Sequence, residues 1–266
     1  MLSQLHMAKS GTFVYQRMLQ VVANNIANAQ TVGFKKRRTE VESLFPLVLE
    51  RAVSEFDDVS GAPGKKRKRY IEYGQGVRIT NIRKDFSNGV IEVTNRPLDI
   101  ALEGRGFLQF RMPDGTYGYG RAGNLQKNAN GDILNANGFP LDPPLTIPRN
   151  VQDIIINQEG RVFAVTAETA EQQEIGQILL AHFPNEEGLK DIGQNLYKET
   201  VMSGEVELKE AARGGMASIR QRSLEFSNVN IIEEMMAMLM TQRAFEVIIK
   251  SMKSADDMLK TGADLK

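Results

Sequence analysis

Adjacent carboxylates are the first residues in this sequence that could do chemistry, because two nearby carboxyl groups can divide acid and base roles. Two such pairs lie in the C-terminal part of the chain, Glu233-Glu234 and Asp256-Asp257. If this part is helical, neighbouring residues point to different faces of the helix. We therefore interpret both pairs as solvated side chains and not as acid–base dyads.

The other candidates for chemistry are a glycine-rich stretch at 103–107 and His182. The stretch lacks the G-x-x-x-x-G-K-[ST] order of a phosphate loop and precedes a strand-like run. His182 has no Ser or Cys partner motif that would make it a catalytic base. The chain has two histidines and no cysteine, which argues against an imidazole-based metal site and excludes disulfides. The sequence thus predicts no catalytic residue, no cofactor and no metal, and hence no enzyme.

The composition limits the remaining classes of protein. A chain of 266 residues can form one large domain or two modest ones, and its formal net charge of zero gives no general attraction to nucleic acid or anionic membranes. No window approaches the roughly 18–20 apolar residues of a membrane span. The N-terminus lacks the charged and apolar regions of a general secretory signal. Export, if it occurs, is expected to use another route without a cleaved signal peptide.

The longest periodic stretch, residues 228–259, predicts a C-terminal helix. Its apolar residues follow a 4-then-3 spacing that keeps them on one face. This seam consists of Ile231, Met235, Met238, Phe245, Ile249, Met252 and Leu259, with Gln242 and Asp256 as polar gaps. A second apolar set lies beside it: Ile232, Met236, Leu239, Ile248 and Ala255. The stripe is wider than a two-stranded coiled coil needs, so the helix should have partners on more than one side.

Residues 2–29 form the other predicted helix, at the opposite end of the chain. Its apolar residues recur at roughly helical spacing: Leu2, Leu5, Phe13, Met18, Val21, Val22 and Ile26. The Asn-rich stretch 23–28 lowers helix propensity. From periodicity alone it is equally consistent with a frayed helix end. Gly33 suits the tight turn that follows.

The region between the helices begins with two basic clusters, at 35–38 and 65–69. A run such as 65–69 can be a nucleic-acid patch. Nearby acidic residues and sparse aromatic residues favour a solvated loop instead. We interpret 46–69 as an extended excursion from the core.

Residues 87–200 have the pattern of a β domain, with strand-like runs at 107–110, 153–156 and 161–165. Asn-Gly and Asp-Gly turns separate such runs, as in a sandwich or barrel. The predicted fold class is α+β, with N- and C-terminal α-helices forming a coiled-coil domain and an all-β domain inserted between them. The predicted boundaries are 1–30 for the N-terminal helix, 31–86 for the connecting region, 87–200 for the β-rich outer domain, 201–226 for a return segment and 227–266 for the C-terminal helix.

Both ends of the chain carry motifs that resemble a known family. Residues 23–28, followed by Thr31, Gly33, Phe34 and Lys35, are similar to the N-terminal signature of bacterial flagellar rod and hook axial proteins. Residues 227–230, Glu234-Met235 and 242–246 resemble the C-terminal signature of that family. Residues 95–107 and 188–197 are similar to its distal rod member. The sequence departs mildly at Ile26 and Phe245, where Leu and Tyr are common, and 65–69 is not part of the pattern.

The resemblance implies a structural subunit of the distal rod, a hollow helical drive shaft that transmits motor torque to the hook. It implies an inner coiled-coil tube, an outer β domain, and export by the flagellar type III apparatus to a periplasmic rod in the basal body. Implied partners are copies of the chain, proximal rod proteins, the hook protein and the surrounding ring proteins. The expected assembly interface comprises Leu5, Phe13, Met18, Val22, Asn24, Asn25, Ile26, Asn28, Ile231, Met235, Met238, Leu239, Gln242, Phe245, Ile249, Met252 and Leu259.

Three alternatives stay open at this point. The first is a proximal rod or hook-type axial subunit, although hook proteins are generally longer. A β-rich cell-wall glycan hydrolase would need a cleft with paired carboxylates, and the sequence offers no convincing pair. A nucleic-acid-binding protein would rely on 35–38 and 65–69, against a net charge of zero.

Overall fold

A computed structural model describes residues 2–52, 68–148, 151–166 and 172–264. The chain divides into two compact units. The helical unit comprises Met1–Asn24, Arg38–Arg83 and Ile232–Lys266, and the β unit comprises Asn25–Arg37 and Lys84–Ile231. The chain is mostly β, with one helix near each end, which confirms the mixed α and β composition expected from the sequence.

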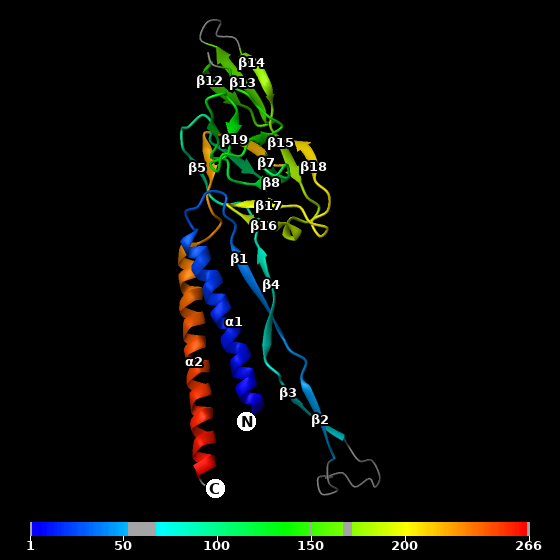
Figure 1. Ribbon diagram of the computed structural model, residues 1–266, viewed down its shortest axis with the longest axis vertical. Helices are drawn as coiled ribbons and strands as arrows, with labels where there is room; N and C mark the ends of the chain where they lie inside the picture. The colour runs from blue at the N-terminus through cyan, green and yellow to red at the C-terminus, as the bar shows by residue number, and fades with distance from the viewer. Residues whose placement is uncertain (1, 53–67, 149–150, 167–171, 265–266) are drawn as a thin grey trace. The chain divides into compact units, whose positions relative to one another are not determined.

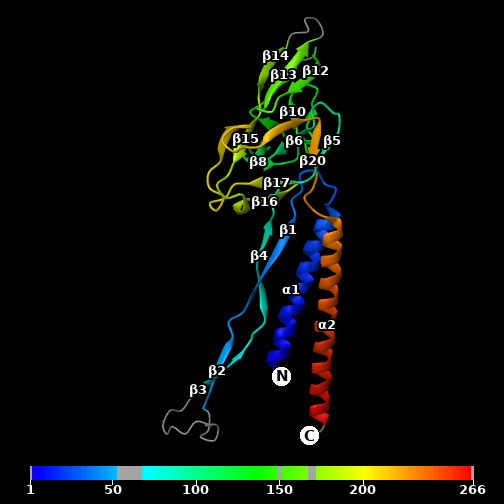
Figure 2. The ribbon, with the colours of Figure 1, turned by 180° about the vertical axis from the view of Figure 1, so that it is seen from behind.

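The helical unit contains α1 (Leu2–Ala27) and α2 (Ile231–Asp264), which lie side by side (Figures 1 and 2). Between them in sequence, β1 (Arg37–Ser43) pairs with β4 (Val77–Lys84). Beyond that pair, β2 (Leu47–Ala52) runs antiparallel to β3 (Lys68–Tyr73). The two ends of the expected excursion 46–69 therefore belong to a strand pair, while 53–67, with most of the basic run 65–69, lie outside the described residues.

Small and branched residues line the face that α1 turns inward. Val14 and Val21 are 2% and 8% exposed, and Gly11 is buried between them and the helix start. A Cβ atom placed at Gly11 would lie 3.2 Å from Ile248 Cδ1 of α2. Glycine at this position thus lets the two helices approach closely, although it lowers helix propensity.

The inward face of α2 is offset by one residue from the predicted seam. Met238, Phe245 and Met252 are half-buried, as that seam requires. At the other seam positions, the residue one position earlier in the chain is the one that faces inward: Glu234, Thr241 and Ile248. Their neighbours Met235, Gln242 and Ile249 are exposed. A 4-then-3 spacing fits either of these two sets of residues. Because the apolar stripe is wide, α2 can be rotated about its axis so that small residues such as Thr241 face inward.

Sheets of very different size make up the β unit (Figures 1 and 2). The largest has the order β16 (Lys190–Gly193), β17 (Leu196–Lys198), β8 (Tyr117–Gly120), β7 (Phe107–Arg111), β15 (Leu179–His182) and β18 (Glu207–Glu210), with β11 (Leu141–Asp142) also pairing with β7. A second sheet has the order β12 (Val151–Ile156), β13 (Arg161–Thr166) and β14 (Gln172–Gln177). Three strand pairs complete the unit: β6 (Ile100–Glu103) with β19 (Ser218–Gln221), β5 (Ile91–Val93) with β20 (Ser223–Glu225), and β9 (Gln126–Lys127) with β10 (Ile133–Leu134). In the described part of the β unit, a 3-10 turn, η2, spans Glu186–Gly188.

The core of the β unit is densely filled. Ile100, Leu102 and Leu108 are fully buried in its main apolar cluster. A second cluster is aromatic, and its rings meet edge to face, as Tyr119 and Phe183 do with centroids 4.9 Å apart. The strands expected at 107–110, 153–156 and 161–165 are confirmed as β7, β12 and β13. Strands β18 to β20, within the expected return segment 201–226, were not indicated by the sequence.

Among the described helices, none has a stretch long and apolar enough to cross a membrane.

Candidate functional site: an exposed helix face and a buried clasp

Along α1, the residues expected at the interface differ widely in exposure. Phe13 is 64% exposed, whereas Met18, Val22 and Ile26 are half-buried. The side chain of Leu5 lies outside the described residues. An aromatic side chain as exposed as Phe13 contributes little to the interior of a single chain, so this residue is available for contact with another molecule.

Asn25, which the sequence placed in the assembly interface, has an intrachain role within the β unit. It is 1% exposed. Its Oδ1 accepts a hydrogen bond from the Arg37 main-chain N–H at 3.0 Å, and its Nδ2 donates to the Arg37 carbonyl oxygen at 2.9 Å. A side-chain amide carries both a donor and an acceptor, so it can satisfy both main-chain groups of a single residue. Of the other two asparagines, Asn24 is exposed and Asn28 accepts from the Thr31 hydroxyl at 3.3 Å.

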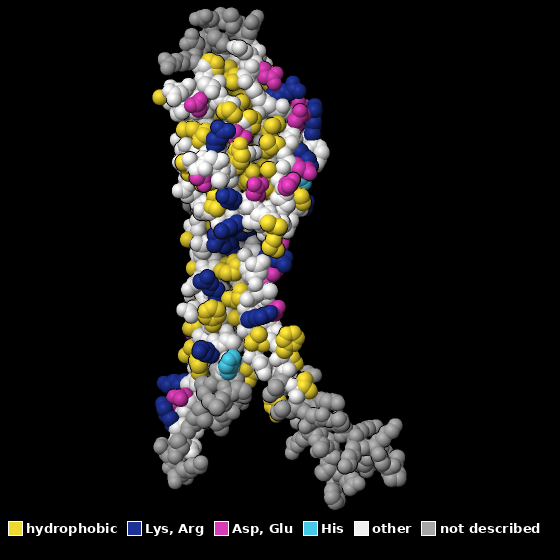
Figure 3. Space-filling view, turned by 45° about the vertical axis from the view of Figure 1, so that its right-hand side comes forward, with side chains coloured by type: hydrophobic (Ala, Val, Ile, Leu, Met, Phe, Trp, Pro, Cys, Tyr) yellow, Lys and Arg dark blue, Asp and Glu magenta, His cyan; other side chains and the backbone are white. Residues whose placement is uncertain are grey.

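The first three turns of α2 expose a continuous set of large apolar side chains. Its members share exposures between 43% and 74%: Ile231, Ile232, Met235, Met236, Leu239 and Met240. Val247, Ile249 and Met258 continue the set along the helix at 65%, 40% and 64%. The side chain of Leu259 lies outside the described residues. Figure 3 shows hydrophobic side chains, in yellow, among Lys and Arg on the visible surface of the helical unit.

A contiguous apolar patch of this kind is typical of an interaction site, because scattered single residues are normal but continuous patches are rare on monomers. We call the set Ile231, Ile232, Met235, Met236, Leu239 and Met240 the open face of α2. It includes Ile231 and Met235 of the predicted seam, together with three residues of the second apolar set: Ile232, Met236 and Leu239.

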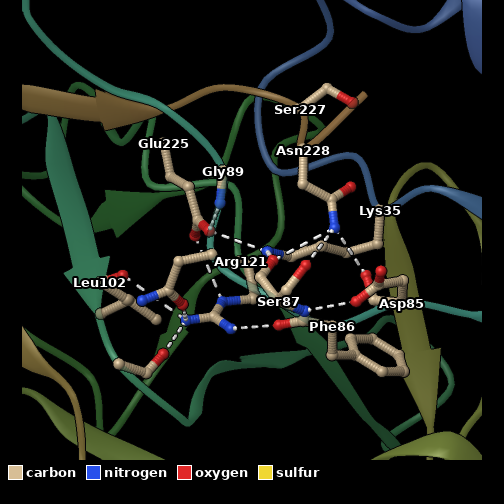
Figure 4. Close-up of polar contacts among 12 residues, drawn as sticks. Lys35, Asp85, Phe86, Ser87, Gly89, Leu102, Arg121, Glu225, Ser227 and Asn228 are labelled. Atoms are coloured by element: carbon tan, nitrogen blue, oxygen red, sulfur yellow. Dashed lines mark hydrogen bonds and ion pairs between the residues drawn. The ribbon is translucent and has the colours of Figure 1, made fainter. Parts of the chain in front are cut away.

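Within the β unit, one buried carboxylate holds two buried cations (Figure 4). Glu225, on β20, pairs through Oε1 with Lys35 Nζ at 2.8 Å and through Oε2 with Arg121 Nε at 3.2 Å. The side chains of all three are at most 1% exposed. The Gly89 main-chain N–H also donates to Glu225 Oε1, at 2.9 Å.

Main-chain carbonyls complete the coordination of the two cations. Lys35 Nζ donates to the Ser87 carbonyl oxygen at 2.6 Å. The Arg121 guanidinium donates to the carbonyl oxygens of Phe86, at 3.3 Å, and Gly104. Burial and the neighbouring Arg121 charge lower the pKa of Lys35 to about 8, against the opposing effect of Glu225. The pair of cations is thus held in place by one anion and several dipoles.

Asn228 ties the segment before α2 to the same place. Its Nδ2 donates to the Asp85 carbonyl oxygen at 2.9 Å and its Oδ1 accepts from the Lys36 main-chain N–H at 2.8 Å. We call Lys35, Arg121, Glu225 and Asn228 the clasp. It joins the segment after α1 to the segment before α2, about 190 residues away along the chain.

Gly33 lets these two segments come together. Its N–H donates to the Glu225 carbonyl oxygen at 2.9 Å. Its φ of 68° lies in the left-handed region, and a Cβ atom there would come 2.6 Å from the Ala122 nitrogen. Only glycine fits both requirements.

The clasp is a structural device, because its charged groups are sealed from solvent and from any substrate. Among the described residues there is also no group of three or more His, Cys, Asp or Glu side chains that could hold a metal ion. Lys35 was indicated by the N-terminal signature and Asn228 by the C-terminal one, but nothing in the sequence pointed to Arg121 or Glu225. Glu225 lies in β20 and Arg121 directly follows β8, and a single charged residue in or beside a strand carries no signal of its partner.

Comparison with known proteins matches three segments of the chain to family models. Residues 15–35 match the family described as "Flagella basal body rod protein", 101–164 match "Flagellar hook protein FlgE/F/G D1 domain", and 220–265 match "Flagellar basal body rod FlgEFG protein C-terminal". The chain is 36% identical to the flagellar basal-body rod protein FlgG of Caulobacter vibrioides, with 98% of each chain covered. This chain belongs to the flagellar basal-body rod protein family. It is also 35% identical to the FlgG protein of Borreliella burgdorferi and 31% identical to that of Bacillus subtilis, over at least 99% of each chain.

Each family segment of this rod protein supplies part of the clasp. Lys35 ends the first matched segment, Arg121 lies in the second, and Glu225 and Asn228 lie in the third. The family signatures at the two ends therefore include residues that close the β unit, in addition to residues on the helices. The matches confirm the family predicted from the sequence. Some residues of the family motifs make contacts within the chain.

Proposed function

We propose that the chain is a structural subunit of the flagellar distal rod, which self-assembles into a hollow helical drive shaft that transmits motor torque to the hook. The observation that carries the proposal is the open face of α2, whose six large apolar side chains are each at least 43% exposed. Family membership supplies the setting in which copies of the chain cover that face. The protein acts by binding its own kind and carries out no catalysis.

Assembly has a clear physical driving force in this account. Fully burying one Leu, Ile or Met side chain contributes roughly 1.5–3 kcal/mol. The open face, together with Phe13, offers enough such side chains to offset the cost of association. We propose that the terminal helices pack into a coiled-coil tube around the shaft axis. Head-to-tail contacts that do not close then extend the tube into a filament.

The proposed interface keeps most of the residues expected from the sequence. On α2 it comprises Ile231, Met235, Leu239, Gln242 and Ile249, which are exposed, and Met238, Phe245 and Met252 at its border. We assign Leu259, Leu5, Met18, Val22, Ile26, Asn24 and Asn28 to the same interface by their places on the helices.

The proposed partners are further copies of this chain, proximal rod proteins, the hook protein and the surrounding ring proteins. The proposed location is the periplasmic rod of the basal body, reached through the flagellar type III export apparatus. A proximal rod or hook-type subunit is the alternative within the same family, and it predicts the same open face with different end partners.

Electron microscopy of the purified protein tests the proposal. The unaltered chain is expected to form rod-like polymers, and Leu239→Glu is expected to abolish them, because a charge in the centre of the open face must be desolvated on assembly. Ser254→Glu, which places the same charge at an exposed polar position of α2, serves as the matched control and should polymerise.

Failure of the unaltered chain to polymerise would contradict the proposal as a whole. Equal polymerisation of Leu239→Glu and Ser254→Glu would instead refute the role of the open face. Circular dichroism of each variant shows whether the fold is retained.

A further inference from the structure

The connection between β17 and β18 presents two apolar side chains with no role in the core. Val201 is 101% exposed and Met202 is 77% exposed, at the tip of the turn 200–204. No other adjacent pair of large apolar residues in the described part of the β unit is as exposed. We call Val201 and Met202 the apolar tip.

Hydrogen bonds hold this turn in one conformation. The Thr200 hydroxyl donates to the Gly188 carbonyl oxygen at 2.6 Å and accepts from the Met202 N–H at 3.1 Å. The Ser203 hydroxyl, fully buried, donates to the Thr200 carbonyl oxygen at 2.8 Å, and Asn185 Nδ2 donates to the Met202 carbonyl oxygen at 3.1 Å. Because the turn is already ordered, a partner that binds the tip has little conformational entropy to remove.

The same unit contains a recess suited to such a tip. Its volume is about 240 Å³, and none of the residues that line it is charged. Phe110 and Leu196 line it with Val32 and Ala136, while Asn124 and Asn137 add side-chain amides. The Asn124 Oδ1 atom is buried with no hydrogen-bond partner among the described residues, so it offers an acceptor to a main-chain N–H that enters the recess.

We propose that the apolar tip of one copy of this chain inserts into the recess of the next copy. The residues of both surfaces are uncharged, so neither must lose the hydration of a charge on contact. The yellow connection after β17 carries the tip, and the blue segment after α1 supplies Thr31 and Val32 to the rim of the recess (Figures 1 and 2).

Because Val201 is fully exposed and hydrogen bonds hold its turn, the tip does not occupy the recess of its own chain. Between copies, the tip and the recess give a heterologous contact. Such contacts generate an open filament when the rotation does not close. The inference rests on the proposed self-assembly, and it names a contact between β units that is separate from the open face of α2.

The absence of cysteine from the sequence makes the contact directly testable. Val201→Cys combined with Ala136→Cys places one thiol on the tip and one at the recess. In polymers treated with a short bis-maleimide, this double variant is expected to give a ladder of covalent oligomers. The matched control combines Val201→Cys with Val90→Cys, an exposed apolar residue outside the recess, and should give no ladder.

A second measurement uses polymerisation itself. Val201→Asp together with Met202→Asp is expected to raise the protein concentration needed for polymerisation at least about tenfold, equivalent to roughly 1.4 kcal/mol or more per contact. The substitutions lie at the exposed tip of a turn, so circular dichroism should show an unchanged fold.

The outcomes separate this inference from the proposed function. If the unaltered chain polymerises but the two cysteine pairs cross-link equally, or the aspartate variant polymerises normally, the contact is refuted and the rod proposal stands. If the unaltered chain does not polymerise, both fail. If the tip instead mediates binding to phosphatidylcholine vesicles, lost in the aspartate variant, it faces lipid and the contact between copies is refuted.

Discussion

The interior of the β unit and the open face of α2 differ in which side chains they bury. In the interior of the β unit, even charged groups are buried, because the side chains of Lys35, Arg121 and Glu225 are at most 1% exposed. On α2, side chains that would normally form a core, such as Leu239 and Met240, are at least half exposed. The core of the β unit is thus complete within a single chain, whereas the open face of α2 is a surface that we propose another copy covers.

The clasp offers the largest test of this contrast. Glu225→Gln leaves two buried cations without their anion, and breaking a buried pair in this way costs roughly 3–5 kcal/mol. Urea unfolding followed by the near-ultraviolet signal of the tyrosines is expected to show a loss of that size. The matched control is Glu159→Gln, whose partners Arg161 and Arg213 are 41% and 60% exposed and whose exposed ion pairs should contribute at most about 1 kcal/mol. Equal effects of the two substitutions would contradict the structural role of the clasp.

A matched pair of leucines compares the two regions directly. Leu102→Ala removes a fully buried side chain from the β-unit core and should lower the free energy of unfolding by roughly 2–5 kcal/mol. Leu239→Ala removes a side chain that is 50% exposed and should change the stability of the monomer by about 0.5 kcal/mol or less. Leu239→Ala should nevertheless weaken polymerisation, which sedimentation measures. A large loss of monomer stability in Leu239→Ala would show that this face is already covered within the chain.

The pH dependence of stability gives the smallest of these effects. Burial lowers the pKa of Lys35 to about 8, below its ordinary value of 10.5. Between these values the unfolded chain binds more protons at this residue than the folded chain, so the contribution of Lys35 to stability rises with pH. Relative to Lys35→Met, the unaltered chain should gain on the order of 1 kcal/mol in unfolding free energy between pH 8 and 9. A difference that is flat or falls over this range would show that Lys35 stays protonated.

Local patterns in the sequence predicted the local structure well. The strand-like runs around Phe107 and Val162 became β7 and β13, and Asn130-Gly131 lies in the turn between β9 and β10. The two helices were predicted from their periodicity. The inward face of α2 was harder to predict, because a 4-then-3 spacing can be drawn through Met235 or through Glu234. Which of the two faces inward depends on the packing between the helices, for example on the close contact of Gly11 with Ile248.

Pairings over long sequence distances could not be predicted in this way. The sequence placed Asn25 in the expected assembly interface, and gave no sign that its amide bonds to the main chain of Arg37. The bond between Lys35 and Glu225 joins residues 190 positions apart, and neither residue type specifies its partner. The family resemblance identified the right segments, and only the three-dimensional arrangement separates residues that close the β unit from residues left for assembly.

Amide hydrogen exchange, compared between monomer and polymer, tests the central claim most directly. Residues 231–259 of α2 are expected to exchange quickly in the monomer, because one face of the helix lacks packing partners, and to become strongly protected in the polymer. Strand β7, at the centre of the large sheet, serves as the internal control and should be equally protected in both states. Equal protection of residues 231–259 in monomer and polymer would contradict the account.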